Sequence, residues 1–199
     1  MKLLARCFAI TLLLPTLALA APEAISLSGA TIVTGTRPQP LEVLAARELQ
    51  RYLYRLDGVL PRVSARPPAR GTALLVGTPQ SHPEIAALAR AGSVAVSTKA
   101  LGAEGFVLKA LPGARPRVVV TAATPQGVLW AAYALLERLG IGFYLGGDAF
   151  AGAGPPQVPA DLEVTQRPAF AVRGSLPWYN FLNSPTTWDR DDYRFFFDQ

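Results

Sequence analysis

The sequence predicts a domain of the α/β class, and three observations support this. Short apolar segments of strand-like composition alternate along the chain with segments in which apolar residues recur at helical spacing. Half of the 199 residues are apolar, which excludes a disordered chain. The helical segments carry recognisable start and stop signals. The length fits one globular domain, or one domain plus part of another.

Cysteine and histidine occur once each, as Cys7 and His82. This excludes a disulfide scaffold, a cysteine-based zinc site, an iron–sulfur cluster and a multi-histidine metal site, and no cofactor is expected. The formal charge is +5 at pH 7, and it falls to +3 without Lys2 and Arg6, which lie in a segment expected to be removed. A charge this mild and this scattered does not indicate a nucleic-acid partner.

Residues 1–20 resemble a secretory signal peptide in their order of features. A basic start precedes an apolar stretch and Pro15, and Ala18-Leu19-Ala20 offers small residues for cleavage after Ala20. The alternative is a membrane anchor, but the apolar run of about 15 residues is short of the roughly 20 that a spanning helix needs. We therefore expect a mature chain in the periplasm or outside the cell, with no membrane contact after cleavage.

The first half of the chain predicts two helices and several strands. A strand is expected over 25–33, broken at Gly29, followed by a helix over 41–56, short strands over 62–65 and 73–76, and a helix over 82–91. Polar residues, Glu42 among them, fill the solvent face expected for the first helix, and Asp57-Gly58 ends it because glycine tolerates the left-handed turn.

The second half predicts a strand hairpin over 104–111 and 117–122, joined through Pro112-Gly113. Thr124-Pro125 is typical of a helix start, with a hydroxyl cap and proline at the first helical position. This helix runs to Leu139, and apolar residues around most of its circumference predict burial on more than one side. A strand over 141–145, a linker over 146–159 and a strand over 170–173 are expected to follow.

The last segment predicts a helix that does not finish. Asp189 is placed to cap its first amides, with Asp191 and Asp192 in the first turn. The sequence ends on three phenylalanines (residues 195–197) followed by Asp198 and Gln199, and no residue typical of a helix C-terminus is present. Three consecutive phenylalanines need a partner surface, so we expect the sequence to break off at the start of a second domain.

Most short motifs in the sequence lack the other residues, or the order of elements, that their chemistry requires. His82-Pro83-Glu84 has the spacing that opens the zinc deaminase signature, but that metal site also needs a cysteine pair, so His82 is read as a first-turn residue of a surface helix. Gly140-Ile141-Gly142 follows a helix and opens a strand, the reverse of a dinucleotide-binding loop. No serine lies in a nucleophile elbow.

The sequence also shows no pair of carboxyl groups suited to glycoside hydrolysis. Two facing carboxyls are required, roughly 5–9 Å apart. Asp189, Asp191 and Asp192 are neighbours on one turn and point in different directions, so they are read as helix-capping acids. No catalytic residue is predicted within these 199 residues.

The segment 170–188 carries the candidate binding residues. Arg173, Trp178, Tyr179, Asn180 and Trp188 combine aromatic faces, which bind sugar rings, with groups that bind hydroxyls or a carboxylate. The alternative is that the tryptophans seal the rim of a barrel core, and the sequence leaves both interpretations open. For Arg173 a ligand role is favoured, because an arginine that ends a barrel strand points to the face where ligands bind.

Several motifs together resemble a known family. Ala45-Ala46-Arg47-Glu48-Leu49-Gln50, Leu74-Leu75-Val76-Gly77-Thr78 and Glu104-Gly105-Phe106 resemble the N-terminal domain of α-glucuronidases and related glycoside hydrolases. The stretch from Thr124-Pro125-Gln126-Gly127 to Gly140-Ile141-Gly142-Phe143-Tyr144 matches the same domain and is also similar to the second domain of family 20 β-hexosaminidases. The resemblance covers roughly residues 25–165.

The resemblance implies a mixed sheet of about six strands with helices packed on one face, in a zincin-like shape that carries no metal and no catalytic role. It implies that a (β/α)8 barrel follows, with its first strand entered at Arg167 to Gly174 and the sugar-binding role falling to Arg173. The expected organisation is a signal peptide over 1–20, an accessory α/β domain over 21–165 and the start of a truncated barrel over 166–199.

Two functions remain open from the sequence. The first is the N-terminal part of an exported glycoside hydrolase in carbohydrate degradation, whose catalytic acids lie beyond Gln199 and whose partners are a carbohydrate and its own C-terminal barrel. The second is a free-standing, non-catalytic module that binds glycans or acts as a scaffold.

Overall fold

The computed structural model of the chain describes residues 23–144, 146–152, 154–174 and 185–198. Its centre is a six-stranded mixed sheet in the order β10-β5-β6-β4-β2-β3. The strands are β2 (Thr31–Thr34), β3 (Arg62–Ser64), β4 (Ala73–Gly77), β5 (Phe106–Leu111), β6 (Arg117–Ala122) and β10 (Glu163–Gln166). Strands β3, β2, β4 and β6 run parallel, whereas β5 and β10 are antiparallel to their neighbours. The six-stranded mixed α/β sheet expected from the sequence is confirmed.

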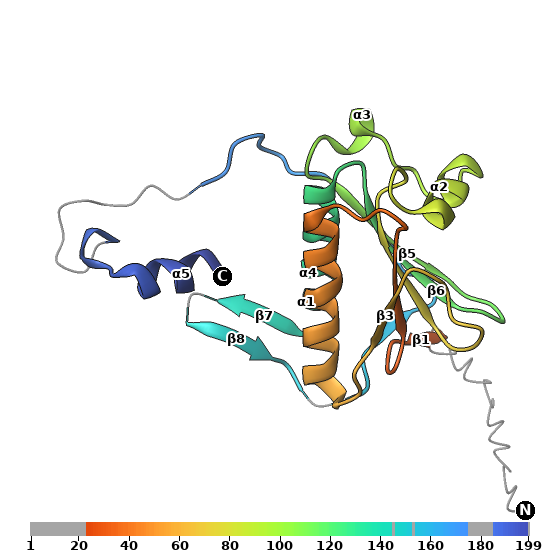
Figure 1. Ribbon diagram of the computed structural model, residues 1–199, viewed down its shortest axis with the longest axis horizontal. Coiled ribbons are helices and arrows are strands. Elements are labelled where there is room, and N and C mark those ends of the chain that lie inside the picture. The colour runs from red at the N-terminus through yellow and green to blue at the C-terminus, as the bar shows by residue number, and fades with distance from the viewer. Residues whose placement is uncertain (1–22, 145, 153, 175–184, 199) are drawn as a thin grey trace, which may run out of the picture.

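Two long helices cover one face of this sheet (Figure 1). They are α1 (Pro40–Asp57) and α4 (Pro125–Arg138), which lie side by side. Fully buried side chains of α1 and α4 such as Leu49 and Leu135 pack with Leu74 and Leu108 from the inward-facing positions of the strands. Because alternate strand residues point to opposite faces, this core takes every second residue of β4, β5 and β6.

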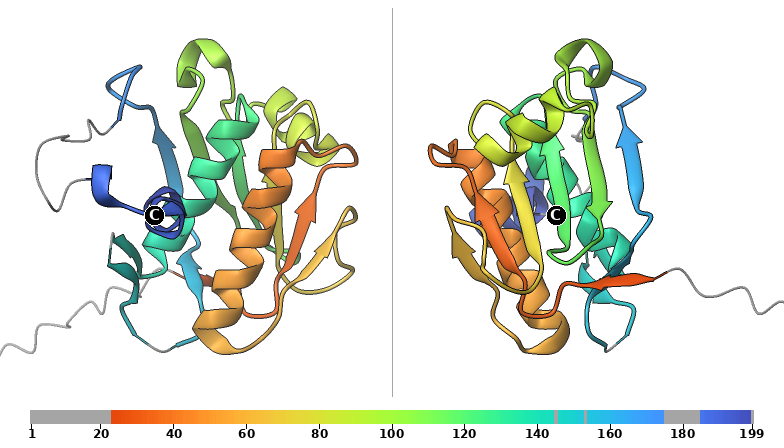
Figure 2. Two further views of the ribbon diagram at one scale, coloured as in Figure 1. Left: turned by 60° about the vertical axis from the view of Figure 1, so that its left-hand side comes forward. Right: turned by 90° about the vertical axis from the view of Figure 1, so that its right-hand side faces the viewer.

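The opposite face of the sheet carries a second, smaller layer, which Figure 2 shows in its right-hand view. Helix α2 (Pro83–Arg90) and the short α3 (Thr98–Leu101) bring Ile85 and Leu101 onto the other set of strand residues, such as Leu75 and Val119. The expectation that helices pack on one face only is therefore wrong. Since β4 is buried along its whole length, both of its faces need cover.

The helix ends follow the signals in the sequence. The Thr124 hydroxyl accepts a hydrogen bond from the amide of Gly127 at 3.1 Å, with Pro125 at the first helical position of α4. Helix α1 ends at Gly58, whose φ of 76° is left-handed and whose amide donates to the carbonyl of Tyr54. The boundaries of both helices lie within one residue of those expected.

Two small two-stranded sheets flank the main one. Strand β1 (Ala24–Ser26) pairs with β9 (Gln157–Pro159), and β7 (Ile141–Tyr144) pairs with β8 (Gly147–Phe150), both antiparallel. The expected strand over 25–33 is thus two strands in different sheets. The expected linker over 146–159 holds β8 and β9, and β10 beyond it closes the main sheet at the β5 edge.

The C-terminal segment differs in part from expectation. Residues 167–174 form no strand, and Phe170 and Val172 are largely exposed. After η1 (Pro185–Thr187), helix α5 (Arg190–Asp198) begins as expected, because Asp189 Oδ1 accepts from the amides of Asp191 and Asp192 at 2.7 and 2.9 Å. Residues 1–20, where the signal peptide is expected, lie outside the described residues. In the part of the chain that the structure describes, no helix has the length and apolar character to span a bilayer.

Candidate functional site

A cavity of about 640 Å³ is lined mainly by residues of α1 and α4, together with Phe106 of β5 and Gln166 of β10. We call it the helix-face groove. Glu48, Arg51 and Tyr52 line it from α1, Tyr133 lines it from α4, and Asp148 lines it from β8. Phe143 of β7 and Phe197 of α5 border it as well, so the groove collects side chains that are up to about 150 positions apart in the sequence.

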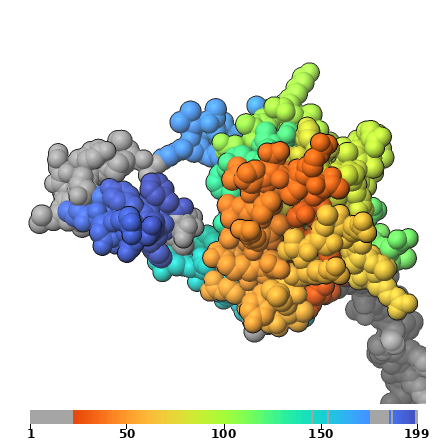
Figure 3. Space-filling model, viewed as in Figure 1, coloured from red at the N-terminus to blue at the C-terminus, as the bar shows by residue number. Residues whose placement is uncertain are grey.

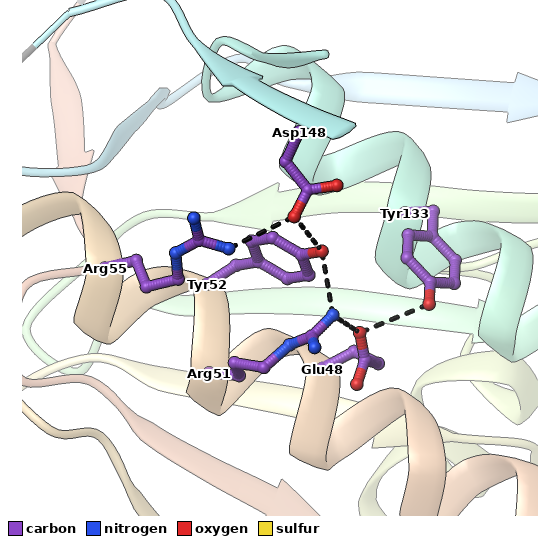
Figure 4. Close-up of polar contacts among 6 residues, drawn as sticks. All are labelled: Glu48, Arg51, Tyr52, Arg55, Tyr133 and Asp148. Atoms are coloured by element: carbon purple, nitrogen blue, oxygen red, sulfur yellow. Dashed lines mark hydrogen bonds and ion pairs between the residues drawn. The ribbon is translucent and has the colours of Figure 1, made fainter. Parts of the chain in front are cut away.

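A chain of hydrogen bonds connects these polar side chains (Figure 4). Arg51 donates to Glu48 at 2.7 Å and to the Tyr52 hydroxyl at 2.8 Å. Tyr52 in turn donates to Asp148 at 2.7 Å, and Arg55 reaches the same carboxylate oxygen at 3.1 Å. The Tyr133 hydroxyl donates to Glu48 at 3.2 Å. Each of the two carboxylates is therefore held by one arginine and one tyrosine.

Aromatic contacts fix the tyrosines in place. The ring of Phe143 lies edge-on to Tyr52, with centroids 5.4 Å apart, and edge-on to Tyr133, with centroids 5.0 Å apart. The guanidinium of Arg51 lies 4.5 Å above the Tyr52 ring, and that of Arg55 lies 4.4 Å above the Phe150 ring. The β7–β8 hairpin thus contacts the rings of both tyrosines through Phe143 and the Tyr52 hydroxyl through Asp148.

The electrostatics keep both phenols neutral. Burial raises the pKa of Tyr52 to about 12, and its hydrogen bond to Asp148 adds to the shift. Burial also raises the pKa of Tyr133 well above its usual range, with the nearby charge of Glu48 as a further cause. The two phenols therefore keep their protons and donate to Asp148 and Glu48.

This arrangement suits recognition better than acid–base catalysis. A general acid in glycoside hydrolysis must hold a proton on a carboxyl, and Glu48 and Asp148 each accept from a cation and a phenol instead. The rim carries exposed apolar side chains, namely Leu44, Trp130 and Phe197. Tryptophan, tyrosine and arginine together are the residue types that dominate binding surfaces.

A second crevice lies outside the carboxyl ends of the parallel strands β2 and β4. Their connections lead to helices on opposite faces of the sheet, and such a switch point is where open α/β sheets bind ligands. A cavity of about 370 Å³ lies there, lined by residues such as Arg37, Thr78 and Ser81.

The side chain of Glu42 is buried beside that crevice and binds donors of residues that line it. Its Oε1 accepts from the Thr78 amide at 2.8 Å and from the Ser81 hydroxyl at 2.6 Å, and its Oε2 accepts from the Gln39 amide at 2.6 Å. The donors that would hold a ligand anion are therefore satisfied by the chain itself. Glu42 was expected on the solvent face of its helix, but it is completely buried because these three donors need an acceptor.

His82 lies beside this cluster as the residue that caps α2. Its Nδ1 accepts from the Ile85 amide at 3.4 Å, while the buried Nε2 has no hydrogen-bond partner among the described residues. Burial lowers the pKa of His82, so the ring is neutral. The expected position at the start of a helix is confirmed, but the side chain is buried rather than on the surface.

The residues predicted to bind carbohydrate lie elsewhere. Arg173 is in an exposed loop, paired with Glu104, and donates to the carbonyl of Phe170 at 3.0 Å. Trp188 packs against Tyr193 and Phe196 around α5, with ring centroids 5.5 and 5.2 Å apart. The remaining three candidates, Trp178, Tyr179 and Asn180, lie outside the described residues. Arg173 and Trp188 line different parts of the molecule, and neither lines the helix-face groove.

Sequence reasoning missed the helix-face groove. Glu48 and Arg51 stand three residues apart on the polar side of α1, a spacing typical of an ordinary surface ion pair. Tyr52 fits the apolar spacing of its helix, no role was predicted for Tyr133, and Asp148 lies in the segment expected to be a linker. Among the described residues, no three His, Cys, Asp or Glu side chains are grouped so that they could hold a metal ion.

Comparison with known proteins assigns the chain to a family. The family described as the N-terminus of glycosyl hydrolase family 67 matches residues 19–135, more than half of the chain. No curated protein matches the chain. A solved structure of a family GH115 4-O-methyl-α-glucuronidase with specificity for decorated arabinogalactans is similar in fold, with a TM-score of 0.53 at 13% identity over 73% of this chain.

Two hexosaminidase structures are further matches. The GH20 β-N-acetylhexosaminidase from Streptomyces coelicolor A3(2) gives a TM-score of 0.41 at 18% identity, and the N-acetyl-β-hexosaminidase of Streptomyces plicatus gives 0.42 at 17% identity. Each match covers 76% of this chain and 24% of the solved one. The matched part of the GH115 structure is 18% of that chain, so the chain described here spans a minor part of each of these enzymes.

The fold is a mixed α/β domain similar to part of the GH115 structure. The chain belongs to the family of glycosyl hydrolase family 67 N-terminal domains. The resemblance to glucuronidase-type N-terminal domains read from the sequence is confirmed.

Proposed function

We propose that the chain is the exported N-terminal part of a glycoside hydrolase that degrades carbohydrate, and that the catalytic acids lie in a barrel beyond Gln199. The observation that carries this proposal is the family match over residues 19–135. The organisation proposed with it is a signal peptide over 1–20, an accessory domain over 21–165 and the beginning of the barrel from residue 166.

The geometry around Glu48 and Asp148 supports a non-catalytic role. Glu48 and Asp148 each bind an arginine and a tyrosine of the chain itself, an arrangement that suits a structural role. In this proposal both catalytic carboxyls come from a barrel that follows the domain, and Glu48 and Asp148 take no part in hydrolysis.

The helix-face groove is the surface that we propose for contact with the barrel. It combines a rigid polar network with exposed Leu44 and Trp130, which are 40% and 38% exposed. Phe195 and Phe197 of α5 add further exposed apolar surface, and Phe197 lines the groove. Large exposed aromatics beside satisfied polar groups are typical of a surface that is covered in the complete protein.

An activity assay tests the non-catalytic role. The purified 199-residue chain should release no product from aryl glycosides, whereas a longer chain read from the same frame should do so. Measurable turnover by the 199-residue chain would overturn the placement of the acids. A stop codon at position 200 would favour the alternative, a free-standing module that binds glycans through residues such as Trp188.

Footprinting tests the proposed contact surface. Hydroxyl-radical labelling of Trp130 should fall at least severalfold in the longer chain relative to the 199-residue chain. Leu60 is a suitable internal control, because it is 65% exposed and does not line the groove. Equal labelling of Trp130 in both chains contradicts the proposed contact. Mass analysis of the mature protein tests export, with cleavage after Ala20 as the expected result.

A further inference from the structure

The chain leaves the domain after β10 through residues 167–173, which we call the exit segment. Figure 3 shows it in lighter blue at the upper left, where it projects from the body of the domain. Residues of the exit segment line a cavity of about 240 Å³ together with residues of the α3–β5 turn, which spans 102–105. The exit segment, which forms no helix or strand, therefore lies against a turn from much earlier in the sequence.

The α3–β5 turn is held firmly by the domain. The hydroxyl of Thr124, which caps α4, donates to the carbonyl of Ala103. Gly105 is packed so closely that a Cβ there would lie 2.8 Å from the carbonyl oxygen of Gln166, at the end of β10. The backbone is thus fixed on both sides of Glu104, and its carboxylate has a defined position on the domain surface.

Two arginines of the exit segment lie on this turn. Arg173 forms an ion pair with Glu104 across 69 positions of the sequence, and it donates to the Phe170 carbonyl at 3.0 Å. One guanidinium therefore joins the turn to the exit segment. Toward the other end of the segment, Arg167 passes over Gly102, where a Cβ would lie 3.7 Å from its Nε. The side chains of Glu104 and Arg173 are 32% and 44% exposed, so solvent only partly surrounds the pair.

The backbone of the exit segment suits such an attachment. Pro168 fixes its own φ and restricts Arg167 before it. The small side chains of Ala169 and Ala171 line the cavity beside the turn. A segment with this restricted start needs few further contacts to hold one course, because less conformational freedom is lost when its far end is fixed.

We propose that Glu104 is a positioning residue which, by holding Arg173, fixes the direction in which the chain leaves the domain. The consequence for the enzyme rests on the proposed function, in which the barrel begins at residue 166. The ion pair then joins the accessory domain to the entry of the barrel and sets the course of the chain between them. Val172 is 90% exposed beside the pair, so the held segment also presents an apolar side chain to the part that follows.

Limited digestion of the 199-residue chain with trypsin tests the proposal. Trypsin binds the arginine side chain that precedes the bond it cleaves, so the bond between Arg173 and Gly174 is cut only after Arg173 leaves Glu104. The bond after Arg167 does not compete, because trypsin does not cleave before a proline. Glu104→Ala should raise the initial rate of cleavage after Arg173 by about twofold to fivefold, the range for a partly exposed ion pair.

A matched variant separates the release of Arg173 from a general loosening of the domain. Glu163→Ala removes the carboxylate of another exposed ion pair, with Lys109, and should leave the rate after Arg173 unchanged. Cleavage after Arg70, in an exposed loop, is the internal reference for trypsin activity in each digest. Raising NaCl from about 20 to about 500 mM should increase the normalised rate in the unmodified chain but not in Glu104→Ala, because salt screens the pair.

The proposal is overturned if Glu104→Ala leaves the normalised rate after Arg173 unchanged, or if Glu163→Ala raises it equally. Equal melting temperatures of the three proteins establish that the domain stays folded. Should Glu104→Ala not fold, Glu104→Gln, which keeps the size of the side chain and removes its charge, provides the same comparison. Because the readout is a cleavage site in the 199-residue chain, the result does not depend on whether a longer chain is an active glycosidase.

Discussion

Replacement of Glu42 by alanine should destabilise the domain far more than any exposed substitution on the same helices. The Glu42 carboxylate is completely buried and accepts from two backbone amides and one hydroxyl, at 2.6 to 2.8 Å. A hydrogen bond to a charged group contributes roughly 1.5–3 kcal/mol to stability.

The expected cost follows from what the donors can do without Glu42. The Ser81 hydroxyl keeps the Thr78 carbonyl at 3.3 Å as a partner, and the Thr78 amide keeps the Ser81 oxygen at 3.2 Å. The Gln39 amide loses its recorded side-chain acceptor. Allowing for this partial compensation, we expect a loss of about 3 kcal/mol in the free energy of unfolding, and a fall in Tm of roughly 6–12 °C.

Urea unfolding followed by circular dichroism measures this change directly. The matched control is Glu137→Ala, because Glu137 is an exposed glutamate on the neighbouring helix and should change stability by less than about 0.5 kcal/mol. Glu42→Gln keeps the volume and one acceptor, so it should fall between the two. If Glu42→Ala and Glu137→Ala have the same midpoint, the carboxylate does not organise the crevice and the argument is wrong.

Three further predictions concern single residues. The lowered pKa of His82 means that the unfolded chain takes up the proton first, so stability should be constant above the usual value of 6.5 and fall as pH drops below it. His82 is the only histidine of the sequence, and His82→Asn keeps a side-chain acceptor for the helix cap. In thermal melts between pH 7.5 and 5.5, this variant should lose the fall in Tm that the unmodified chain shows. The same fall in Tm in both proteins contradicts the prediction. Gly127→Ala would place a Cβ 2.7 Å from the carbonyl oxygen of Gly105. Although alanine favours helices more than glycine does, this clash should lower the Tm by the equivalent of about 1–3 kcal/mol in the free energy of unfolding. A raised Tm would refute the close packing. Tyr52→Phe removes the hydroxyl that donates to Asp148 and should cost about 1–2 kcal/mol in urea unfolding, with no change as the opposing result.

In both the helix-face groove and the crevice at Glu42, polar groups of the chain bind one another, although Asp148 Oδ1 is buried without a hydrogen-bond partner among the described residues. In the groove, two carboxylates are held by arginines and neutral phenols. In the crevice, the buried Glu42 carboxylate accepts from the Thr78 amide and the Ser81 hydroxyl. Both observations support the proposal that this domain supports another part of the enzyme rather than performing chemistry.

Local sequence determined the two long helices and the longer strands. The recurrence of apolar residues over 41–56, the Thr124-Pro125 start and the glycine stop at Gly58 act within one or two helical turns, and the structure follows them within one residue. Strands β4 and β6 were also predicted closely, because continuous runs of buried β-branched and aliphatic residues indicate a strand regardless of its partners.

Tertiary structure decided the short strands and every polar site. Strands of three or four residues, such as β8 and β9, exist only because a distant segment completes their hydrogen bonds, and no local pattern encodes that partner. Glu42 has the sequence pattern of a solvent-facing residue and is buried because donors 36 and 39 positions away need its oxygens. Asp148 meets Tyr52 across 96 positions. The sequence therefore determined where the chain would form regular structure, and the packing of distant segments determined which polar groups would face each other.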